Sequence, residues 1–127
     1  MNYFKRAEID KVRLPGRVIQ TAVGKEGLSR SQKMTMGFAH YSAESGPMEP
    51  HHHAEEVVYI IDARDGWMRY GPGKDQLGER VPLQAGMILH IPPLEWHVFG
   101  YEAGGYLDIA FIYGQVDQIR PEEMTGQ

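Results

Sequence analysis

The chain has 127 residues, a net charge of −4, 42% hydrophobic residues and no cysteine. This length fits one domain with a hydrophobic core, and the composition is too apolar for a disordered chain. The lack of cysteine excludes a disulfide framework, a thiolate metal site and a cysteine nucleophile. No stretch approaches the roughly 18 apolar residues of a membrane span, and no apolar signal run follows the N-terminus. We therefore expect a cytoplasmic protein with no membrane partner.

Short runs of alternating apolar and polar residues recur along the chain. Residues 17–23 and 32–41 predict two early strands, and residues 56–61 and 67–70 predict a hairpin with a loop at 62–66. Further strands are predicted at 79–84, 87–91, 96–101 and 106–113, and one short helical turn at 121–124. The 15 glycines and 8 prolines punctuate these runs and disfavour a helix bundle. The pattern predicts a single all-β domain, a sandwich or a barrel.

Charge is distributed unevenly between the two ends of the chain. Residues 1–33 hold eight bases and three acids, whereas the remainder is acidic. One interpretation is a basic N-terminal arm that packs on the acidic body of its own chain or of a partner; the other is a solvated basic face. The negative net charge argues against a nucleic-acid partner.

Clustered histidines are the main functional signal. His51, His52 and His53 are consecutive and precede Glu56, and His97 follows some forty residues later. In an extended segment alternate side chains share a face, so His51 and His53 can point the same way. With a carboxylate and a third imidazole, they could hold one divalent transition metal (Fe, Mn, Ni, Zn or Cu) and leave positions open for substrate. The alternative is a solvated histidine triplet at the surface.

Two segments, GPMEPHHHAEEVVYII from Gly46 and GMILHIPPLEWHVF from Gly86, resemble the two sequence motifs of the cupin superfamily. In the second segment, Gly86, Pro92 and His97 match the spacing of the family motif. Leu94 stands where the family usually has glycine. The resemblance covers roughly residues 34–113.

The first motif matches less closely, because only two residues separate His53 from Glu56. We prefer the register in which the ligands are His51, His53, Glu56 and His97, since the short interval spans a turn whose length can vary. In the other register His52 and Glu56 keep the family spacing, and Pro50 stands where the first histidine belongs. Glu55 is an alternative to Glu56.

The resemblance implies a jelly-roll β-barrel with a metal inside one end, and it favours a homodimer. The domain would span residues 1–127, with a barrel core at about 34–113, an N-terminal arm at 1–33 and a C-terminal tail at 114–127. We expect a metal-dependent enzyme acting on a small molecule, of the dioxygenase-type oxidoreductase class. The alternatives are a metal-dependent isomerase or lyase, and a non-catalytic module that binds a carboxylate or a sugar. No catalytic residue is assigned.

Three further residues are candidates for the pocket or for supporting the ligands. His90 shares the parity of Ile88 and Pro92, and His40 shares that of Met36 and Phe38. Each would line the barrel interior or be a core histidine bonded to a backbone carbonyl. Arg69 could bind a substrate carboxylate or phosphate, or form a surface ion pair.

Overall fold

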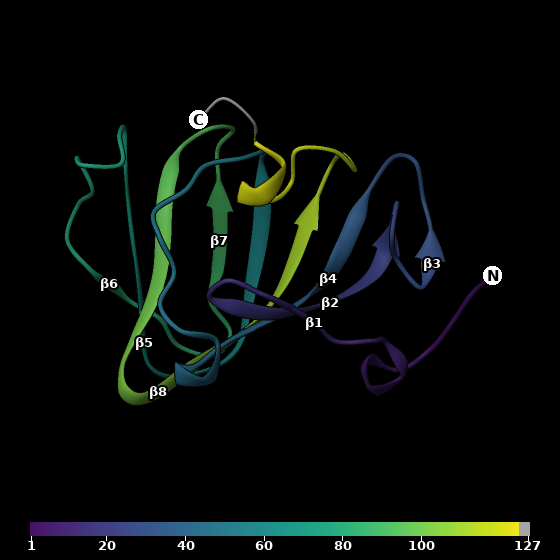
Figure 1. The fold of residues 1–127 in the computed structure, drawn as a ribbon, viewed down its shortest axis with the longest axis horizontal. Helices are drawn as coiled ribbons and strands as arrows, with labels where there is room; N and C mark the ends of the chain where they lie inside the picture. Colours follow the sequence, from purple (N-terminus) through teal and green to yellow (C-terminus); the bar gives the residue numbers. More distant parts are fainter. Residues whose placement is uncertain (125–127) are drawn as a thin grey trace.

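The computed structural model describes residues 1–124 and is built almost entirely from β-strands (Figure 1). The strands are β1 (Val12–Leu14), β2 (Arg17–Gly24), β3 (Ser29–Arg30), β4 (Thr35–Tyr41), β5 (Glu56–Gly71), β6 (Val81–Pro82), β7 (Ile88–Ile91) and β8 (Trp96–Tyr113). Three short 3₁₀ turns complete the fold: η1 (Arg6–Glu8), η2 (Ala43–Ser45) and η3 (Pro121–Glu123). No helix among these residues is long and apolar enough to cross a membrane. The predicted tail is described as far as residue 124, and 125–127 lie outside the described residues.

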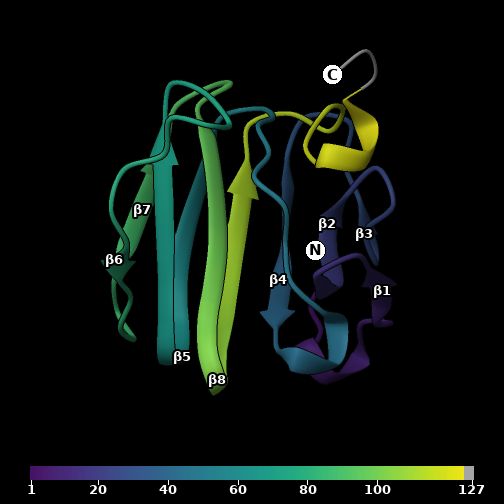
Figure 2. The same cartoon turned by 60° about the vertical axis from the view of Figure 1, so that its left-hand side comes forward.

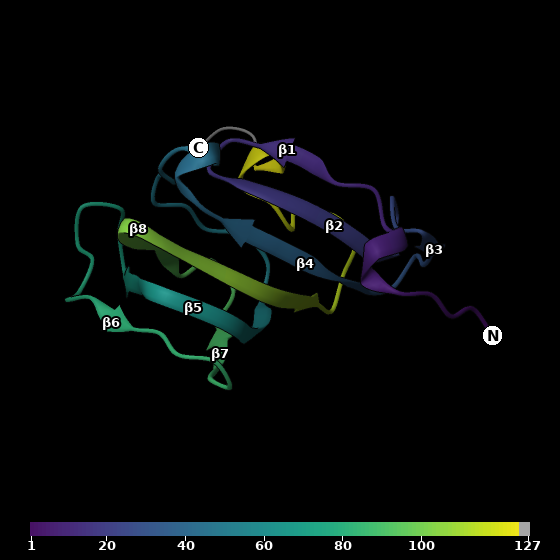
Figure 3. The same cartoon turned by 90° about the horizontal axis from the view of Figure 1, so that it is seen from below.

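The strands form one eight-stranded sheet in the order β1-β2-β4-β8-β5-β6, with β3 beside β2 and β7 beside β5. Figure 3 shows β2, β4, β8 and β5 side by side in this order. All pairs are antiparallel except β2 with β3. Within the described residues the sheet is not closed by hydrogen bonds. The all-β prediction is confirmed, and the arrangement is that of a jelly roll.

β5 and β8 form a long two-stranded ribbon that folds back on itself (Figures 1 and 2). The pairing runs from Glu56 opposite Tyr113 to Gly71 opposite Trp96, with register shifts near Asp62 and Gly66. The predicted hairpin with a loop at 62–66 is therefore wrong. Residues 62–64 keep partners on β8, so the chain bends without leaving the ladder. The predicted strands at 96–101 and 106–113 likewise join into β8.

One further strand prediction needs correction, and two short strands have no counterpart in the sequence pattern. The strand expected at 79–84 is reduced to the two residues of β6, which lies at the edge of the sheet, where a proline such as Pro82 is tolerated. β1 and β3 were not predicted, since runs of two or three residues carry no readable periodicity. The helical turn predicted at 121–124 is confirmed as η3.

The core lies on the inner face of the folded ribbon. Val58 and Ile60 of β5 and Leu107 and Ile109 of β8 are almost completely buried, whereas the alternate residues Val57 and Tyr59 of β5 are exposed. This alternation follows from the two-residue period of a strand. Burial of such side chains supplies most of the stabilising free energy, at about 25 cal/mol per Å² of apolar surface.

The N-terminal arm packs on the outer face of its own sheet. The Arg6 guanidinium donates two hydrogen bonds, of 2.7 and 2.8 Å, to the two carboxylate oxygens of Asp108 on β8. Arg6 also lies over the ring of Phe38, 4.5 Å from its centroid. The Gln20 amide donates to the carbonyls of Arg6 and Ile9, at 3.0 Å each. Of the two partners considered for the basic arm, the structure shows its own chain.

The contact between Arg6 and Asp108 predicts that the protein loses stability at acid pH. Burial acts to raise the pKa of Asp108, but the hydrogen bonds from Arg6 and His40 outweigh burial and lower it below its ordinary value. The pKa of this carboxyl group is lower in the folded protein than in the unfolded chain. Its contribution to stability is therefore full at pH values above the pKa of the unfolded chain, and it is lost as the pH falls through the pKa of the folded protein. We expect Asp108→Asn to reduce the free energy of unfolding by about 1–3 kcal/mol at pH 7 and by much less below pH 3, measured by urea unfolding.

The matched control is Glu102→Gln, which breaks the Arg80–Glu102 ion pair. More than half of each of those side chains is exposed, so the change should be near zero at both pH values. A loss for Asp108→Asn that did not depend on pH would contradict the prediction.

Candidate metal centre

Main-chain hydrogen bonds hold the segments that carry His51, His53 and His97 next to one another. His51 and His97 exchange two main-chain hydrogen bonds, of 3.0 and 2.9 Å, as an isolated antiparallel bridge. The carbonyl of His53 accepts a 2.9 Å hydrogen bond from the amide of Leu94. The segment before β5 is thus tied to the segment that begins β8.

The three imidazoles face one another. Their ligand nitrogens all lie within 4.8 Å of one another, and ring centroids are 4.4 Å apart for His51 and His97 and 4.8 Å for His53 and His97. All three residues are buried, and His97 has no exposed surface at all. Among the described residues, this is the group of His, Cys, Asp and Glu side chains close enough to hold one metal ion.

A backbone carbonyl orients each ring. Nδ1 of His51, His53 and His97 lies 2.9 Å from the carbonyl oxygens of Glu49, Ala54 and Glu95, respectively. Carbonyl oxygens only accept, so each Nδ1 carries the proton and each Nε2 carries a lone pair. Nε2 of His97 is buried and has no hydrogen-bond partner. A buried acceptor without a partner is costly, and a metal ion would satisfy it.

The electrostatics keep these imidazoles neutral. Burial lowers the pKa of His51 to about 4, lowers that of His53, and places that of His97 well below the ordinary value. The neighbouring imidazoles lower these pKa values further. Neutral imidazole is the form that binds a metal, so the site is ready for a cation at neutral pH.

Glu56, the first residue of β5, lies beside this group. Its Oε1 is 3.6 Å from Nε2 of His53, although Glu56 is not part of the group within 4.8 Å. Burial raises the pKa of Glu56 to about 8, despite a hydrogen bond donated by Tyr113. Without a cation, both Glu56 and His53 are neutral near pH 7, so their contact is not an ion pair. A bound cation would favour the ionised carboxylate.

A cavity of about 280 Å³ opens beside the histidines. Its walls come from β2, β4, β5, β8 and the C-terminal segment, and they include His51, His53 and Glu56. Apolar side chains, among them Ile19 and Phe111, line the rest. A small organic molecule could therefore reach the ligand side of the site.

His52 and Glu55 lie elsewhere. The ring of His52 stacks on Trp96, with centroids 4.2 Å apart. The Glu55 carboxylate lies 2.6 Å from Nε2 of His90, and both side chains are more than half exposed. The structure therefore brings together His51, His53 and His97, three of the four residues of the first register. The alternation expected for residues 51–53 is what separates His51 and His53 from His52.

The three pocket candidates do not line this cavity. His40 is bonded to Asp108 at 3.0 Å and stacks on Tyr106 on the outer face of the sheet. His90 is exposed and paired with Glu55. Arg69 donates to the carbonyls of Gly78 and Leu77, at 2.7 and 3.1 Å. The alternation along β4 correctly predicts the residues that share a face with His40. That face points outward, however, and the alternate residues Ala39 and Tyr41 point into the cavity.

The turn before β8 explains the unusual Leu94. Leu94 has φ of 64°, in the left-handed region that favours glycine. The cupin motif has glycine at this position. Leu94 keeps the left-handed conformation because its amide is bonded to His53 and its side chain is exposed. The residue that departs from the motif therefore still adopts a backbone conformation that favours glycine.

Sequence reasoning missed two site residues, Arg17 and Tyr113. Tyr113 continues the inward parity of Ile109 and Phe111, so a readable signal existed. Arg17 begins β2 and lines the cavity, with its guanidinium buried against Glu122. From the sequence, Arg17 is one of the eight bases of residues 1–33, and nothing local shows where β2 lies in the sheet.

No family model and no curated protein sequence matches this chain. Among solved structures, a protein from Planctomyces limnophilus has a TM-score of 0.69 and 18% identity, over 92% of this chain and 91% of its own. The polyketide cyclase RemF from Streptomyces resistomycificus has a TM-score of 0.67 and 19% identity, over 89% and 78%. Fe(II)-HppE with an alternative substrate has a TM-score of 0.65 and 10% identity, over 89% and 60%.

These neighbours define a class of fold. Such similarities, at under 25% identity, establish architecture and leave activity open. The chain has the cupin fold, and it carries a three-histidine group at a cavity inside that fold.

Proposed function

We propose that this protein is a metal-dependent enzyme acting on a small molecule in the 280 Å³ cavity. The observation that carries the proposal is the set of three Nδ1 atoms bonded to backbone carbonyls, which turns three Nε2 lone pairs toward one another. Nε2 of His97 is a buried acceptor without a partner, and a cation shared with the other two rings would satisfy it. Solved neighbours include enzymes, one of them in its Fe(II) form, which supports the assignment.

The ligands in this proposal are His51, His53, His97 and Glu56. Glu56 is included because its buried carboxyl group adjoins Nε2 of His53 and would ionise next to a cation. When bound, a divalent ion supplies Lewis-acid activation of the substrate or, if it is iron, redox chemistry with dioxygen as co-reactant. A dioxygenase-type oxidoreductase is the activity we propose to test first.

Tyr113 and Glu56 form a buried, hydrogen-bonded pair beside the histidines. Tyr113 donates to Glu56, and burial together with Glu56 raises the pKa of Tyr113 well above its ordinary value. The phenol therefore keeps its proton and holds the Glu56 carboxyl group in place. The apolar wall formed by Ile19, Phe99 and Phe111 excludes water from the bound substrate.

Elemental analysis tests the proposal directly. Protein purified without a chelator or an affinity metal should hold close to one equivalent of a first-row transition metal, and His97→Ala should lose most of it. Iron would direct assays to oxygen consumption, and zinc, nickel or manganese to isomerase and lyase substrates. Absence of metal in both proteins, even after incubation with each ion, would refute the proposal. Metal with tight ligand binding and no turnover would instead indicate the binding module.

We also propose that the protein is a homodimer joined through the outer face of its main sheet. Four apolar side chains on this face are 37–70% exposed: Val57, Tyr59, Ile88 and Ile112. They are neighbours across strands, because Val57 pairs with Ile112 and Tyr59 pairs with Ile88. A contiguous apolar patch of this kind favours association of two copies.

Sedimentation velocity at micromolar concentration should therefore give twice the 14.4 kDa mass of one chain. Tyr59→Lys combined with Ile88→Lys should shift the protein to the single-chain mass, because two charges would be buried at the interface. Leu28→Lys, at an apolar residue of similar exposure outside this patch, is the control and should not. A wild-type species of 14.4 kDa alone would exclude the dimer.

A further inference from the structure

The C-terminal segment after β8, residues 114–123, forms one wall of the cavity. Val116, Ile119 and Pro121 face the cavity from this segment. Two of its carbonyls accept hydrogen bonds from the body of the protein: the amide of Ala54 donates to Gln118 at 3.0 Å, and the Thr35 hydroxyl donates to Gln115 at 2.8 Å. We call residues 114–123 the C-terminal strap. Figures 1 and 2 show its last turn, η3, at the end of the molecule where β8 finishes.

Arg17 is the buried cation that faces this strap. Its side chain is only 5% exposed, and its two terminal nitrogens each donate 2.8 Å hydrogen bonds to one oxygen of Glu122. One of them also donates to the carbonyl of Pro15 at 3.0 Å. The Glu122 side chain is 39% exposed, so its carboxylate reaches Arg17 from the solvent side. Arg17 also lines the cavity beside the histidines.

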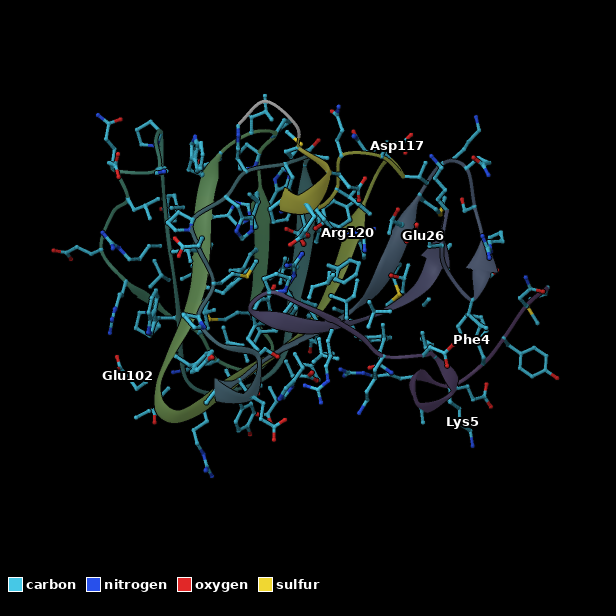
Figure 4. The ribbon with its side chains drawn as sticks, viewed as in Figure 1. Phe4, Lys5, Glu26, Glu102, Asp117 and Arg120 are labelled. Atoms are coloured by element: carbon cyan, nitrogen blue, oxygen red, sulfur yellow. The ribbon has the colours of Figure 1, made fainter. Side chains whose placement is uncertain are left out.

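Three ion pairs join the strap to the body of the protein. The body supplies the cations Arg17 and Lys25, and the strap supplies the acids Glu122 and Asp117 that pair with them, each at 2.8 Å. Arg120 of the strap lies 3.4 Å from Glu26 of the body. Figure 4 shows Glu26, Asp117 and Arg120 at the same end of the molecule. A displaced strap would leave Arg17 and Lys25 at the mouth without their carboxylates.

We propose that Arg17 binds the carboxylate of a small organic acid that enters the cavity, and that Glu122 occupies this position until the acid displaces it. This inference deepens the proposed function, on which it rests, by naming the class of ligand. Glu122 already meets the guanidinium with one oxygen on each terminal nitrogen, so a planar two-oxygen anion fits the position. Ile19, Phe99 and Phe111 would contact the rest of the acid, which favours an apolar body.

Displacement of Glu122 from Arg17 is reversible, because one carboxylate is exchanged for another. Removing Glu122 alone would leave a buried guanidinium without its counter-ion, which is costly. An incoming carboxylate restores the pair at buried Arg17, whereas Lys25 is more than half exposed and becomes solvated when the strap leaves. Lowering of the Glu122 pKa by its hydrogen bond with Arg17 is consistent with an ionised pair in the closed form.

The test uses butyrate as the probe and butyramide as its neutral counterpart, with metal-free protein. Glu122→Gln removes the competing carboxylate, so it should bind butyrate about tenfold more tightly than the wild type in calorimetry. Butyramide should show no such gain. Glu123→Gln is the matched control, because Glu123 pairs with Arg120 and not with Arg17. Arg17→Lys in the Glu122→Gln background should abolish the gain, since lysine lacks the two-nitrogen fork.

Hydrogen exchange gives a second readout on wild-type protein. The Ala54 amide is bonded to Gln118 of the strap, so saturating butyrate should speed its exchange several-fold, and equimolar chloride should not. If Arg17 and Glu122 serve only to hold the strap, Glu122→Gln will lose stability, butyrate will bind neither protein, and Ala54 exchange will not change. That outcome would overturn the inference.

Failure of the metal proposal would look different. His97→Ala should respond to butyrate as the wild type does, because Arg17 and not the metal holds the carboxylate. A gain with butyrate in protein that takes up no metal would leave Arg17 as an acid-binding residue and refute only the metal-dependent activity. Loss of the butyrate response in His97→Ala would overturn the assignment to Arg17.

Discussion

His53→Ala should lower metal affinity by more than about 100-fold, whereas His52→Ala should keep most of the metal. His53 is buried, and its Nδ1 is held by the carbonyl of Ala54, so Nε2 faces the other two imidazoles. His52 instead stacks on Trp96 outside the three-histidine group. The measurement is metal content after dialysis against a chelator of known affinity, for both variants and the wild type.

The two substitutions form a matched pair, because they remove the same side chain from adjacent residues. Circular dichroism should confirm that both variants are folded. A protein that loses metal on His52→Ala and keeps it on His53→Ala would support the second register, in which His52 and Glu56 keep the spacing of the cupin motif. Equal losses would indicate that neither histidine acts as a specific ligand.

Leu107→Ala should reduce the free energy of unfolding by about 2–5 kcal/mol. Leu107 has no exposed surface, and it lies on β8 between Tyr41 of β4 and Ala63 of β5. It also fills the space against Gly66, where an added Cβ would lie 2.4 Å from its Cδ2. Removing the side chain leaves a cavity at the bend of the folded ribbon, measurable by urea unfolding.

Leu28→Ala is the control, since Leu28 is 54% exposed and the same atoms are removed. Its effect should stay within about 0.5 kcal/mol. Comparable losses for the two variants would contradict the assignment of Leu107 to the core.

The sequence was informative where a property depends on local spacing. Alternation at residues 51–53 separated His51 and His53 from His52, and the motifs linked them to His97 across forty residues. The strand pattern gave the all-β class and most of the strands. These features follow from the two-residue period of an extended chain, which requires no knowledge of the fold.

Other features depended on long-range pairing. The hairpin expected at 62–66 is a bend, because β8 supplies partners for Asp62 and Arg64 that no local signal reveals. His40 was placed on the correct parity, but which parity faces inward depends on the packing of the folded ribbon. Arg17 could not be recognised, because Glu122 meets it from the other end of the chain. The dioxygenase-type activity, the homodimer and the cytoplasmic location stay predictions.

The hydrogen bonds that orient the three imidazoles come from the main chain. This affects which substitutions the cavity wall can accept. Each ring is held by a peptide carbonyl within two residues of it in sequence. Substitutions elsewhere in the wall, at Ile19 for example, therefore remove no hydrogen-bond partner of a ligand nitrogen. The substrate-facing surface is free to diversify while the metal-binding geometry is inherited unchanged. Such separation makes this scaffold suitable for acquiring new specificities, in evolution or in the laboratory.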